Sequence, residues 1–234
     1  MADRGEPETR NLVLMGERRI GAYGGTFDPV HSGHIEVARE IVRNFDLDQL
    51  LIIPAHRPPH KGSRPIADAY HRFTMAVLAS LDEPGVLVST IELESPERPY
   101  TFETIDRLQS AFGGGTRLYF VMGADQFEEI NTWREPSRLL SSVDLIVVTR
   151  PGHDVGSSHL EERFRSTIID LRESERQRVS AGDAGEHHIY LTSYVYTDVS
   201  STEIRRRVRD GESIDGLTPP RVAEYIRKYE LYRR

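Results

Sequence analysis

The 234-residue sequence contains no cysteine and a single tryptophan. Without cysteine there is no disulfide scaffold, and because the histidines have no regularly spaced third ligand beside them, a structural zinc site is not expected either. No run of apolar residues approaches the roughly 18 that a membrane-spanning helix requires. Residues 1–10 are polar and acidic, unlike a secretory signal peptide. These absences lead us to expect a cytoplasmic protein without a membrane partner.

The charge balance is acidic, with 30 lysines and arginines against 37 aspartates and glutamates and a formal net charge of −7 at pH 7. Such a charge gives no overall attraction to nucleic acid, so we expect no nucleic-acid partner and basic residues that act locally, at a pocket. A hydrophobic fraction of 38% is enough for one sizeable core. We predict a single domain over residues 18–234, with a small helical part over about 200–234, after a polar extension over residues 1–17.

A glycine-rich turn between an apolar stretch and an amphipathic pattern is the most informative part of the sequence. The block Gly24-Gly25-Thr26-Phe27-Asp28-Pro29-Val30-His31-Ser32-Gly33-His34 follows residues 19–23 and leads into a helical pattern over residues 33–45. Paired glycines let the backbone approach a ligand closely, and a helix N-terminus favours an anion. Because His31 and His34 are three residues apart, both can face one side of the first helical turn and donate to phosphate oxygens. The block predicts a polyphosphate site, although a histidine pair alone is also consistent with coincidence or a helix cap.

A second signal for anion binding lies near the C-terminal end of the sequence. The block Ser200-Ser201-Thr202-Glu203 has the spacing of a capping box, which predicts the start of a helix. The hydroxyls of Ser201 and Thr202, the first helical amides and the guanidinium of Arg205 are placed to converge on phosphates. The arginines at 206, 207 and 209 are better interpreted as a solvated helix face.

Short apolar runs alternate with helical patterns along the rest of the chain. Buried strands are predicted over residues 50–53, 86–88, 118–122, 145–148 and 188–191, and helices over 33–45, 69–81, 101–112, 136–141 and 159–173. This alternation predicts an α/β fold, a Rossmann-like doubly wound parallel sheet with helices on both faces. Ligands of such sheets bind beyond the carboxyl ends of the strands, where most of the motif blocks lie.

As a set, the motif blocks resemble the bacterial nicotinate-nucleotide adenylyltransferases, which are nucleotidyltransferases with an H-x-G-H signature. The signature itself is His31-Ser32-Gly33-His34. Further blocks follow in the order seen in that family: Ile53-Pro54-Ala55-His56-Arg57-Pro58-Pro59-His60-Lys61, Tyr100-Thr101-Phe102-Glu103-Thr104, Met122-Gly123-Ala124-Asp125 with Trp133 beyond it, and Val199-Ser200-Ser201-Thr202-Glu203-Ile204-Arg205. The resemblance covers roughly residues 19–232 and departs from the family's pattern at Val199, where isoleucine is common.

The resemblance implies transfer of AMP from ATP to nicotinic acid mononucleotide, giving nicotinic acid adenine dinucleotide and pyrophosphate, in NAD biosynthesis. It implies that His31, His34 and Arg205 stabilise charge on the phosphates, and that Mg²⁺ is bound together with ATP; no metal-ligating residue is singled out. The ATP-binding residues that it implies are Gly24, Gly25, Thr26, Phe27, Gly33, Gly123, Asp125, Ser200, Ser201 and Thr202. Asp125 would accept from a ribose hydroxyl, whereas its residue type alone is equally typical of a helix N-cap.

For the acceptor nucleotide, the resemblance implies that Trp133 stacks on the pyridine ring. Thr101 and the backbone near Trp133 and Arg134 would meet the nicotinate carboxylate, and Lys61 would contact the mononucleotide phosphate. Judged from the residues alone, Trp133 is equally well explained as a packing residue on a loop, and Lys61 as a solvated lysine. We expect a preference for the nicotinate form over the nicotinamide form, because the block around Tyr100 and Trp133 supplies amides and dipoles.

Other functions stay open at this point. Phosphopantetheine adenylyltransferases share the histidine block, but the Trp133 and Pro58-Pro59-His60-Lys61 blocks favour the nicotinate branch. Class I aminoacyl-tRNA synthetases also carry an H-x-G-H element, yet this chain is short for one and has no broad basic surface. A nucleotide-binding regulator could use the same pocket without turnover. The oligomeric state is also open, a homo-oligomer included.

Overall fold

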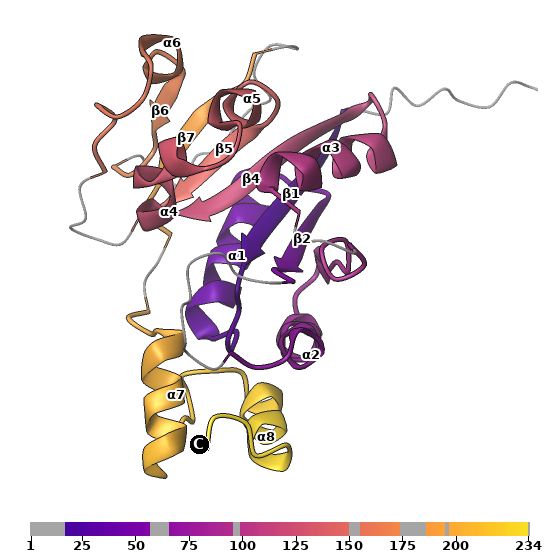
Figure 1. Ribbon diagram of the computed structural model, residues 1–234, viewed down its shortest axis with the longest axis vertical. Coiled ribbons are helices and arrows are strands. Elements are labelled where there is room, and N and C mark those ends of the chain that lie inside the picture. The colour runs from indigo at the N-terminus through magenta and orange to yellow at the C-terminus, as the bar shows by residue number, and fades with distance from the viewer. Residues whose placement is uncertain are drawn as a thin grey trace, which may run out of the picture.

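The computed structural model describes residues 17–56, 66–95, 99–149, 155–173, 186–194 and 197–233. Within these residues the strands form one seven-stranded sheet in which every neighbouring pair is parallel (Figure 1). The strands are β1 (Arg18–Gly25), β2 (Gln49–Pro54), β3 (Val86–Val88), β4 (Thr116–Gly123), β5 (Asp144–Val148), β6 (Ile168–Asp170) and β7 (Ile189–Thr192). Their order across the sheet is β3-β2-β1-β4-β5-β7-β6. This is the doubly wound arrangement that the alternation of strands and helices predicts.

The helices connect the strands and cover the sheet. They are α1 (Ser32–Asn44), α2 (Ala69–Ser80), α3 (Thr101–Phe112), α4 (Ala124–Glu128), α5 (Pro136–Leu140), α6 (Glu162–Arg165), α7 (Ser201–Asp210) and α8 (Pro220–Lys228), with a 3₁₀ turn, η1, at Ile130–Thr132. Among the residues that the structure describes, no helix is long and apolar enough to cross a membrane. The strand order reverses between β1 and β4, so the crevice outside their carboxyl ends is where a ligand is expected.

The two faces of the sheet contribute to separate hydrophobic clusters, because side chains alternate along each strand. On β4, Tyr119 and Val121 belong to one cluster, and Leu118, Phe120 and Met122 belong to the other. The first cluster includes residues of α1, α2, α7 and α8, and the second includes residues of α3, α4, α5 and α6. Helices on both faces confirm the predicted fold class.

The predicted elements agree with the structure except over residues 159–173, where the prediction of one helix is wrong. The helix α6 spans only Glu162–Arg165, and the chain then enters β6, which pairs with β7. The reason lies in Thr167, Ile168 and Ile169, three consecutive β-branched residues whose restricted side chains favour extended backbone over helix. The missed strand β6 forms one edge of the sheet, and the three-residue strand β3 forms the other.

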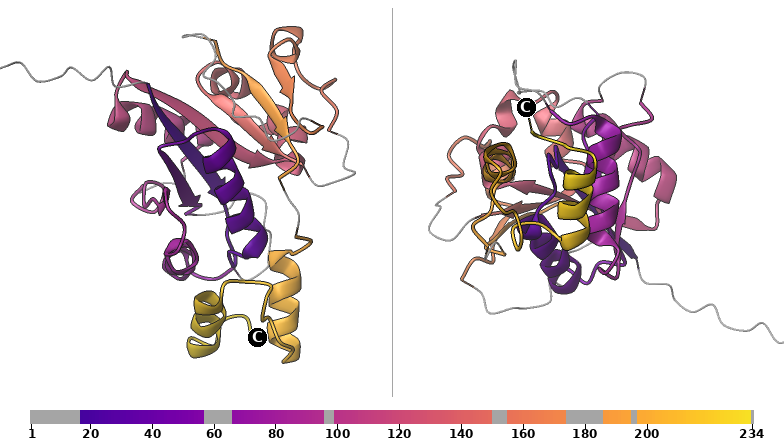
Figure 2. Two further views of the ribbon diagram at one scale, coloured as in Figure 1. Left: turned by 180° about the vertical axis from the view of Figure 1, so that it is seen from behind. Right: turned by 90° about the horizontal axis from the view of Figure 1, so that it is seen from below.

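The two C-terminal helices lie beyond the carboxyl ends of β1 and β2 (Figure 1 and Figure 2). The segment between them is tied to the start of α1, since the Ser32 amide donates to the Leu217 carbonyl at 3.0 Å. The Thr218 hydroxyl donates to the Val30 carbonyl at 2.9 Å. The helical part predicted near the C-terminal end therefore borders the crevice rather than standing apart from it.

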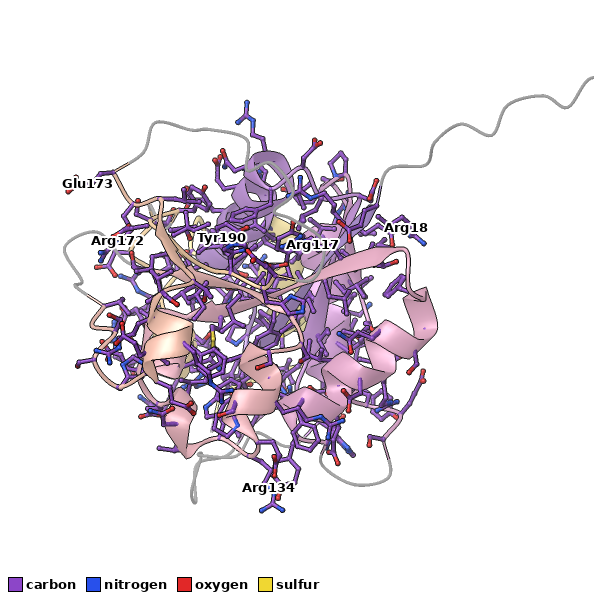
Figure 3. The ribbon with its side chains drawn as sticks, turned by 90° about the horizontal axis from the view of Figure 1, so that it is seen from above. Arg18, Arg117, Arg134, Arg172, Glu173 and Tyr190 are labelled. Carbon is purple, nitrogen blue, oxygen red and sulfur yellow. The ribbon has the colours of Figure 1, made fainter. Side chains whose placement is uncertain are left out.

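The opposite, amino ends of the strands are held together by a buried ion pair. Arg117, at the start of β4, donates from Nε to Asp144 Oδ2 at 2.6 Å and from Nη2 to Oδ1 at 3.1 Å. The His188 amide, just before β7, donates to the same Oδ1 at 2.8 Å. Figure 3 shows Arg117 in the interior of the molecule, whereas Arg172 lies at the periphery. The Asp144 carboxylate therefore joins β4, β5 and β7 far from the crevice.

Candidate active site

The turn between β1 and α1 brings the two histidines face to face. His31 is the N-cap of α1, His34 lies in its first turn, and their ring centroids are 3.6 Å apart with 27° between the ring planes. The His34 ring also lies edge-on to the Phe27 ring, at 5.0 Å between centroids. The predicted placement of both histidines on one side of the first helical turn is confirmed.

One hydrogen bond determines which nitrogen of His34 is available as a donor. The His31 amide donates to His34 Nδ1 at 3.2 Å. Burial and the neighbouring His31 ring lower the pKa of His34 well below its ordinary value, so the His34 ring is neutral. Because Nδ1 acts as an acceptor, the single ring proton is assigned to Nε2. His34 therefore carries an Nε2–H donor, which suits a phosphate oxygen.

Glycine is required in this turn because aromatic rings approach the backbone closely. A Cβ added to Gly25 would lie 2.9 Å from the Phe27 ring, closer than real side chains pack. A Cβ added to Gly33 would lie 3.3 Å from the His31 ring, so the histidine would have to shift. The Phe27 side chain is itself buried, which leaves its backbone as the part that can contact a ligand.

Ser200 begins α7 as its N-cap, and its hydroxyl accepts from the Glu203 amide at 3.2 Å, as the capping box predicts. Arg206 and Arg207 both donate to Glu203 and so belong to a network of surface ion pairs. Arg209 lies beside Asp210 at 3.7 Å. These three arginines form the solvated face that was expected of them.

The first turn of α7 lies directly against the turn that carries the histidines. Ser201 Oγ donates to the Pro29 carbonyl at 2.9 Å, across 172 residues of sequence. Arg205 Nη1 donates to the Asp28 carbonyl at 2.5 Å, and Arg205 Nη2 donates to Thr202 Oγ1 at 3.1 Å. The structure thus brings together the two stretches that the sequence marks as anion sites.

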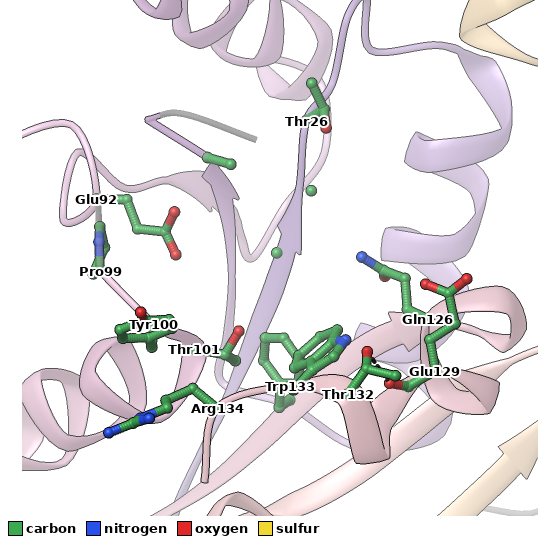
Figure 4. A pocket seen from close by; sticks show the side chains of 14 residues that line it. Thr26, Glu92, Pro99, Tyr100, Thr101, Gln126, Glu129, Thr132, Trp133 and Arg134 are labelled. Atoms are coloured by element: carbon green, nitrogen blue, oxygen red, sulfur yellow. Dashed lines mark hydrogen bonds between the residues drawn. The ribbon is translucent and has the colours of Figure 1, made fainter. Parts of the chain in front are cut away.

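A pocket of about 260 Å³ opens beside the β1–α1 turn, at the carboxyl ends of β1 and β4 (Figure 4). Three residues predicted to contact the acceptor, Thr101, Trp133 and Arg134, line it. Three residues predicted to contact ATP, Gly24, Gly25 and Thr26, line it as well. The pocket therefore joins the glycine turn to the predicted acceptor residues, whereas His31, His34 and Arg205 are not among the residues that line it.

Eight further residues of the pocket were not predicted as site residues: Ala55, Glu92, Pro99, Tyr100, Phe120, Gln126, Glu129 and Thr132. Part of this set had a signal in the sequence. Gln126, Glu129 and Thr132 recur at intervals of three after the predicted strand over 118–122, and such spacing places residues on one side of a helical segment. No sequence pattern marked Glu92, because it lies in a turn outside the helices and strands, where side chains follow no regular spacing.

The charges around the pocket are mixed. Thr101 is the first residue of α3, so the positive end of that helix faces the pocket. Arg134 is exposed, and its side chain points away from Trp133 toward the pocket's edge (Figure 4). The Glu92 carboxylate accepts from Thr104 Oγ1 at 3.1 Å and points toward the pocket (Figure 4). This arrangement suits a ligand that carries an anionic group at one end and hydroxyl donors elsewhere.

One buried arginine, which the sequence analysis did not identify, hydrogen-bonds the backbone of the glycine turn. Arg72, on α2, is 1% exposed and donates to three carbonyls. They belong to Thr26 at 2.8 Å, Ala67 at 3.0 Å and His56 at 3.2 Å. Because burial is only partly offset by nearby acidic groups, the pKa of Arg72 is lowered, yet it stays a cation at neutral pH. Arg72 fixes the Thr26 carbonyl where the turn borders the pocket.

The remaining predicted site residues lie at the crevice or outside the described residues. Gly123 ends β4 and is the N-cap of α4, so the alternative interpretation of Asp125 as an N-cap is wrong. Asp125 is exposed in the first turn of α4. Lys61 falls in a stretch that the structure does not describe. Within the described ranges, no three histidine, aspartate or glutamate side chains gather in a way that could hold a metal ion.

Comparisons with known proteins agree on one family. A model of cytidylyltransferase-like proteins matches residues 22–207. The chain is 38% identical over 218 residues to a probable nicotinate-nucleotide adenylyltransferase of Thermoanaerobacter sp. (strain X514), covering 93% of this chain and 96% of the relative. It is 34% identical over 215 residues to a probable nicotinate-nucleotide adenylyltransferase of Thermus thermophilus, covering 92% and 100%.

Solved structures show the same architecture. A Plasmodium falciparum nicotinic acid mononucleotide adenylyltransferase complexed with NaAD aligns with a TM-score of 0.66 over 92% of this chain and 97% of that chain. At 19% sequence identity, this likeness carries the fold alone. The matched family and the curated relatives both point to a nucleotide-binding enzyme.

Proposed function

This chain belongs to the nicotinate-nucleotide adenylyltransferases, within the cytidylyltransferase-like family, and we infer that it transfers the adenylyl group of ATP to nicotinic acid mononucleotide. The products are nicotinic acid adenine dinucleotide and pyrophosphate, in a step of NAD biosynthesis. The observation that carries the inference is the shared cavity, in which Gly24, Gly25 and Thr26 border Thr101 and Trp133.

The chemistry is a direct displacement. A phosphate oxygen of the mononucleotide attacks the α-phosphorus of ATP, and the new P–O bond forms as the bond to pyrophosphate breaks. Because the nucleophile is already an anion, neither a covalent enzyme intermediate nor a strong base is needed. The protein must align two anions and stabilise charge on the transferred and leaving phosphates.

We assign the phosphate contacts to the two stretches that meet at Asp28 and Pro29. His34 donates from Nε2–H, with His31 stacked on it, and Arg205 with Thr202 binds the leaving phosphates. A neutral imidazole donor keeps its proton at physiological pH, so its hydrogen bond does not depend on a charge that burial opposes.

We assign the acceptor to the pocket of Figure 4. The pyridine ring stacks on Trp133, and the nicotinate carboxylate lies at the start of α3, between Thr101 and Arg134. The positive end of a helix and a guanidinium both favour a carboxylate over a neutral carboxamide. These contacts give a physical basis for selecting the acid form.

The proposal includes a Mg²⁺ ion that enters with ATP. The described residues provide no cluster of three metal ligands. They are therefore compatible with a Mg²⁺ ion that phosphate oxygens and water molecules would hold. When bound, the ion would neutralise part of the negative charge of the phosphates. The chain's own part is to hold the phosphates through His34, Arg205 and the amides of the two helix starts.

Pyrophosphate release tests this function directly. We expect release when the protein is mixed with ATP, Mg²⁺ and nicotinic acid mononucleotide, a lower kcat/KM with nicotinamide mononucleotide, no release with phosphopantetheine, and loss of activity on chelation by EDTA. Equal efficiency with the amide would refute the acid preference. Faster release with phosphopantetheine would refute the acceptor. ATP binding without release from any acceptor would identify a regulator.

Trp133 is expected to act on acceptor affinity rather than on chemistry. Its ring is half-buried and lies edge-on to Phe120, at 6.3 Å between centroids, so alanine removes a stacking surface without opening the core. Trp133→Ala should raise the KM for nicotinic acid mononucleotide about tenfold, with kcat and the KM for ATP nearly unchanged. Tyr70→Ala, which removes an aromatic side chain 70% exposed and outside the pocket, is the matched control. A fall in kcat alone would contradict the stacking role.

A further inference from the structure

Four distant parts of the chain meet at one buried carboxylate, that of Asp28, which is 2% exposed. The Tyr232 hydroxyl, after the end of α8, donates to Asp28 Oδ1 at 2.8 Å, and the Ala67 amide donates to the same oxygen at 3.1 Å. Arg205 Nη1 lies 3.6 Å from the other oxygen, Oδ2. We call Asp28, Ala67, Arg205 and Tyr232 the Asp28 cluster.

The cluster fixes the side chain that is assigned to the leaving phosphates. Arg205 is 8% exposed, and Asp28 holds Nη1 through both its carbonyl and its carboxylate, while Thr202 holds Nη2. Because Asp28 and Thr202 contact both terminal nitrogens of the Arg205 guanidinium, its orientation is fixed before a ligand binds. Preorganised donors stabilise phosphate charge more effectively than donors that must be ordered on binding.

Tyr232 completes the surroundings of the carboxylate. Because the Ala67 amide and the Tyr232 hydroxyl both donate to Oδ1, Oδ2 is left to face Arg205. Burial and the adjacent Asp28 carboxylate raise the pKa of the Tyr232 phenol well above its ordinary value, so the hydroxyl keeps its proton. Loss of this donor would leave Oδ1 underbonded and free the carboxylate to rotate.

We propose that Tyr232, acting through the carboxylate of Asp28, is a positioning residue that holds Arg205 in the orientation needed to bind the β- and γ-phosphates of ATP. The proposal rests on the proposed function, which places ATP at Arg205. The turn after α8, which is 204 residues from Asp28 in the sequence, would then contribute to the affinity for ATP. A residue that only stabilises the fold would not affect the two substrates differently.

The test is Tyr232→Phe, which removes the hydroxyl and keeps the ring. We expect the KM for ATP to rise about fivefold, with the KM for nicotinic acid mononucleotide nearly unchanged and the melting temperature lowered by only a few degrees. The control is Tyr229→Phe in the same turn, because that ring contacts His71 and Tyr225 and is 51% exposed. An unchanged KM for ATP overturns the proposal, as does an equal rise in both KM values.

A double-mutant cycle tests whether the hydroxyl acts through Arg205. In an Arg205→Lys background the planar fork is gone, so Tyr232→Phe should change the KM for ATP by less than about twofold. A fivefold effect that persists in that background would overturn the proposal. The dissociation constant of the α,β-methylene analogue of ATP with Mg²⁺ gives the same comparison without turnover. It therefore separates failure of this proposal from failure of the acceptor assignment.

Discussion

Replacing His34 by alanine is expected to lower kcat by about 10²- to 10³-fold, the cost typical of one lost donor to developing charge. The expectation follows from geometry, because Nδ1 accepts the His31 amide and leaves Nε2–H as the ring's donor. Burial keeps the ring neutral, so no other protonation state compensates. Steady-state kinetics with both substrates saturating measures the effect.

The matched control for this experiment is His71→Ala, which removes a histidine on α2 that contacts Tyr225 and takes no part in the site. Its kcat should stay within about twofold of the parent at a temperature where both proteins are folded, since the half-buried His71 ring joins α2 to α8 and does not line the pocket. His34→Gln retains an amide donor of similar reach and should recover part of the lost rate. If His34→Ala turned over at nearly the parental rate, the assignment of His34 to the phosphates would be wrong.

The second large effect is on stability and lies at the opposite end of the sheet. Asp144→Ala should lower the free energy of unfolding by about 3–5 kcal/mol, because it leaves the Arg117 guanidinium buried without its carboxylate. For a domain of this size, that loss corresponds to a fall in melting temperature of about 6–20 °C. The KM values at low temperature should not change, since the pair lies at the amino ends of the strands.

Asp170→Ala is the control for Asp144→Ala, since Asp170 pairs with Arg172 at the surface and should contribute at most about 1 kcal/mol. The contribution of Asp144 to the free energy of unfolding should also depend on pH. Burial alone would raise the pKa of Asp144, but the nearby His187 ring, at 3.9 Å, and the hydrogen bonds from Arg117 and the His188 amide lower it below its ordinary value. The stabilisation is therefore present above the unfolded pKa of about 3.9 and is lost as pH falls through the folded pKa. Equal melting temperatures for Asp144→Ala and the parent at pH 7 would contradict this.

Much of the site could be predicted because its signals are local. A strand, a glycine turn and a helix lie consecutively in the sequence, so the order of residues alone places His31 and His34 on one helical turn. The capping box at Ser200 likewise marks the start of α7. Local patterns of this kind depend on neighbouring residues alone.

The remainder depended on contacts between distant parts of the chain. Asp28 and Pro29 lie within the signature, but their contacts with α7 arise from the way the C-terminal helices pack beyond β1. Arg72 and Glu92 have no sequence motif, and Tyr232 reaches Asp28 across 204 residues. The error over residues 159–173 has a different origin, since a helical pattern there competed with a run of β-branched residues that an edge strand accommodates.

The division of the site between two sets of elements has an evolutionary consequence. The phosphate contacts that we propose come from the β1–α1 turn and α7, whereas the pocket that we assign to the acceptor is lined largely by Glu92, residues 99–101 and residues within 126–134, in short helices and connecting chain. Insertions and substitutions in such segments disturb a sheet core little. Descendants of one ancestral scaffold could therefore diverge toward new acceptor molecules by changing these segments alone, while the machinery for displacing pyrophosphate is inherited intact.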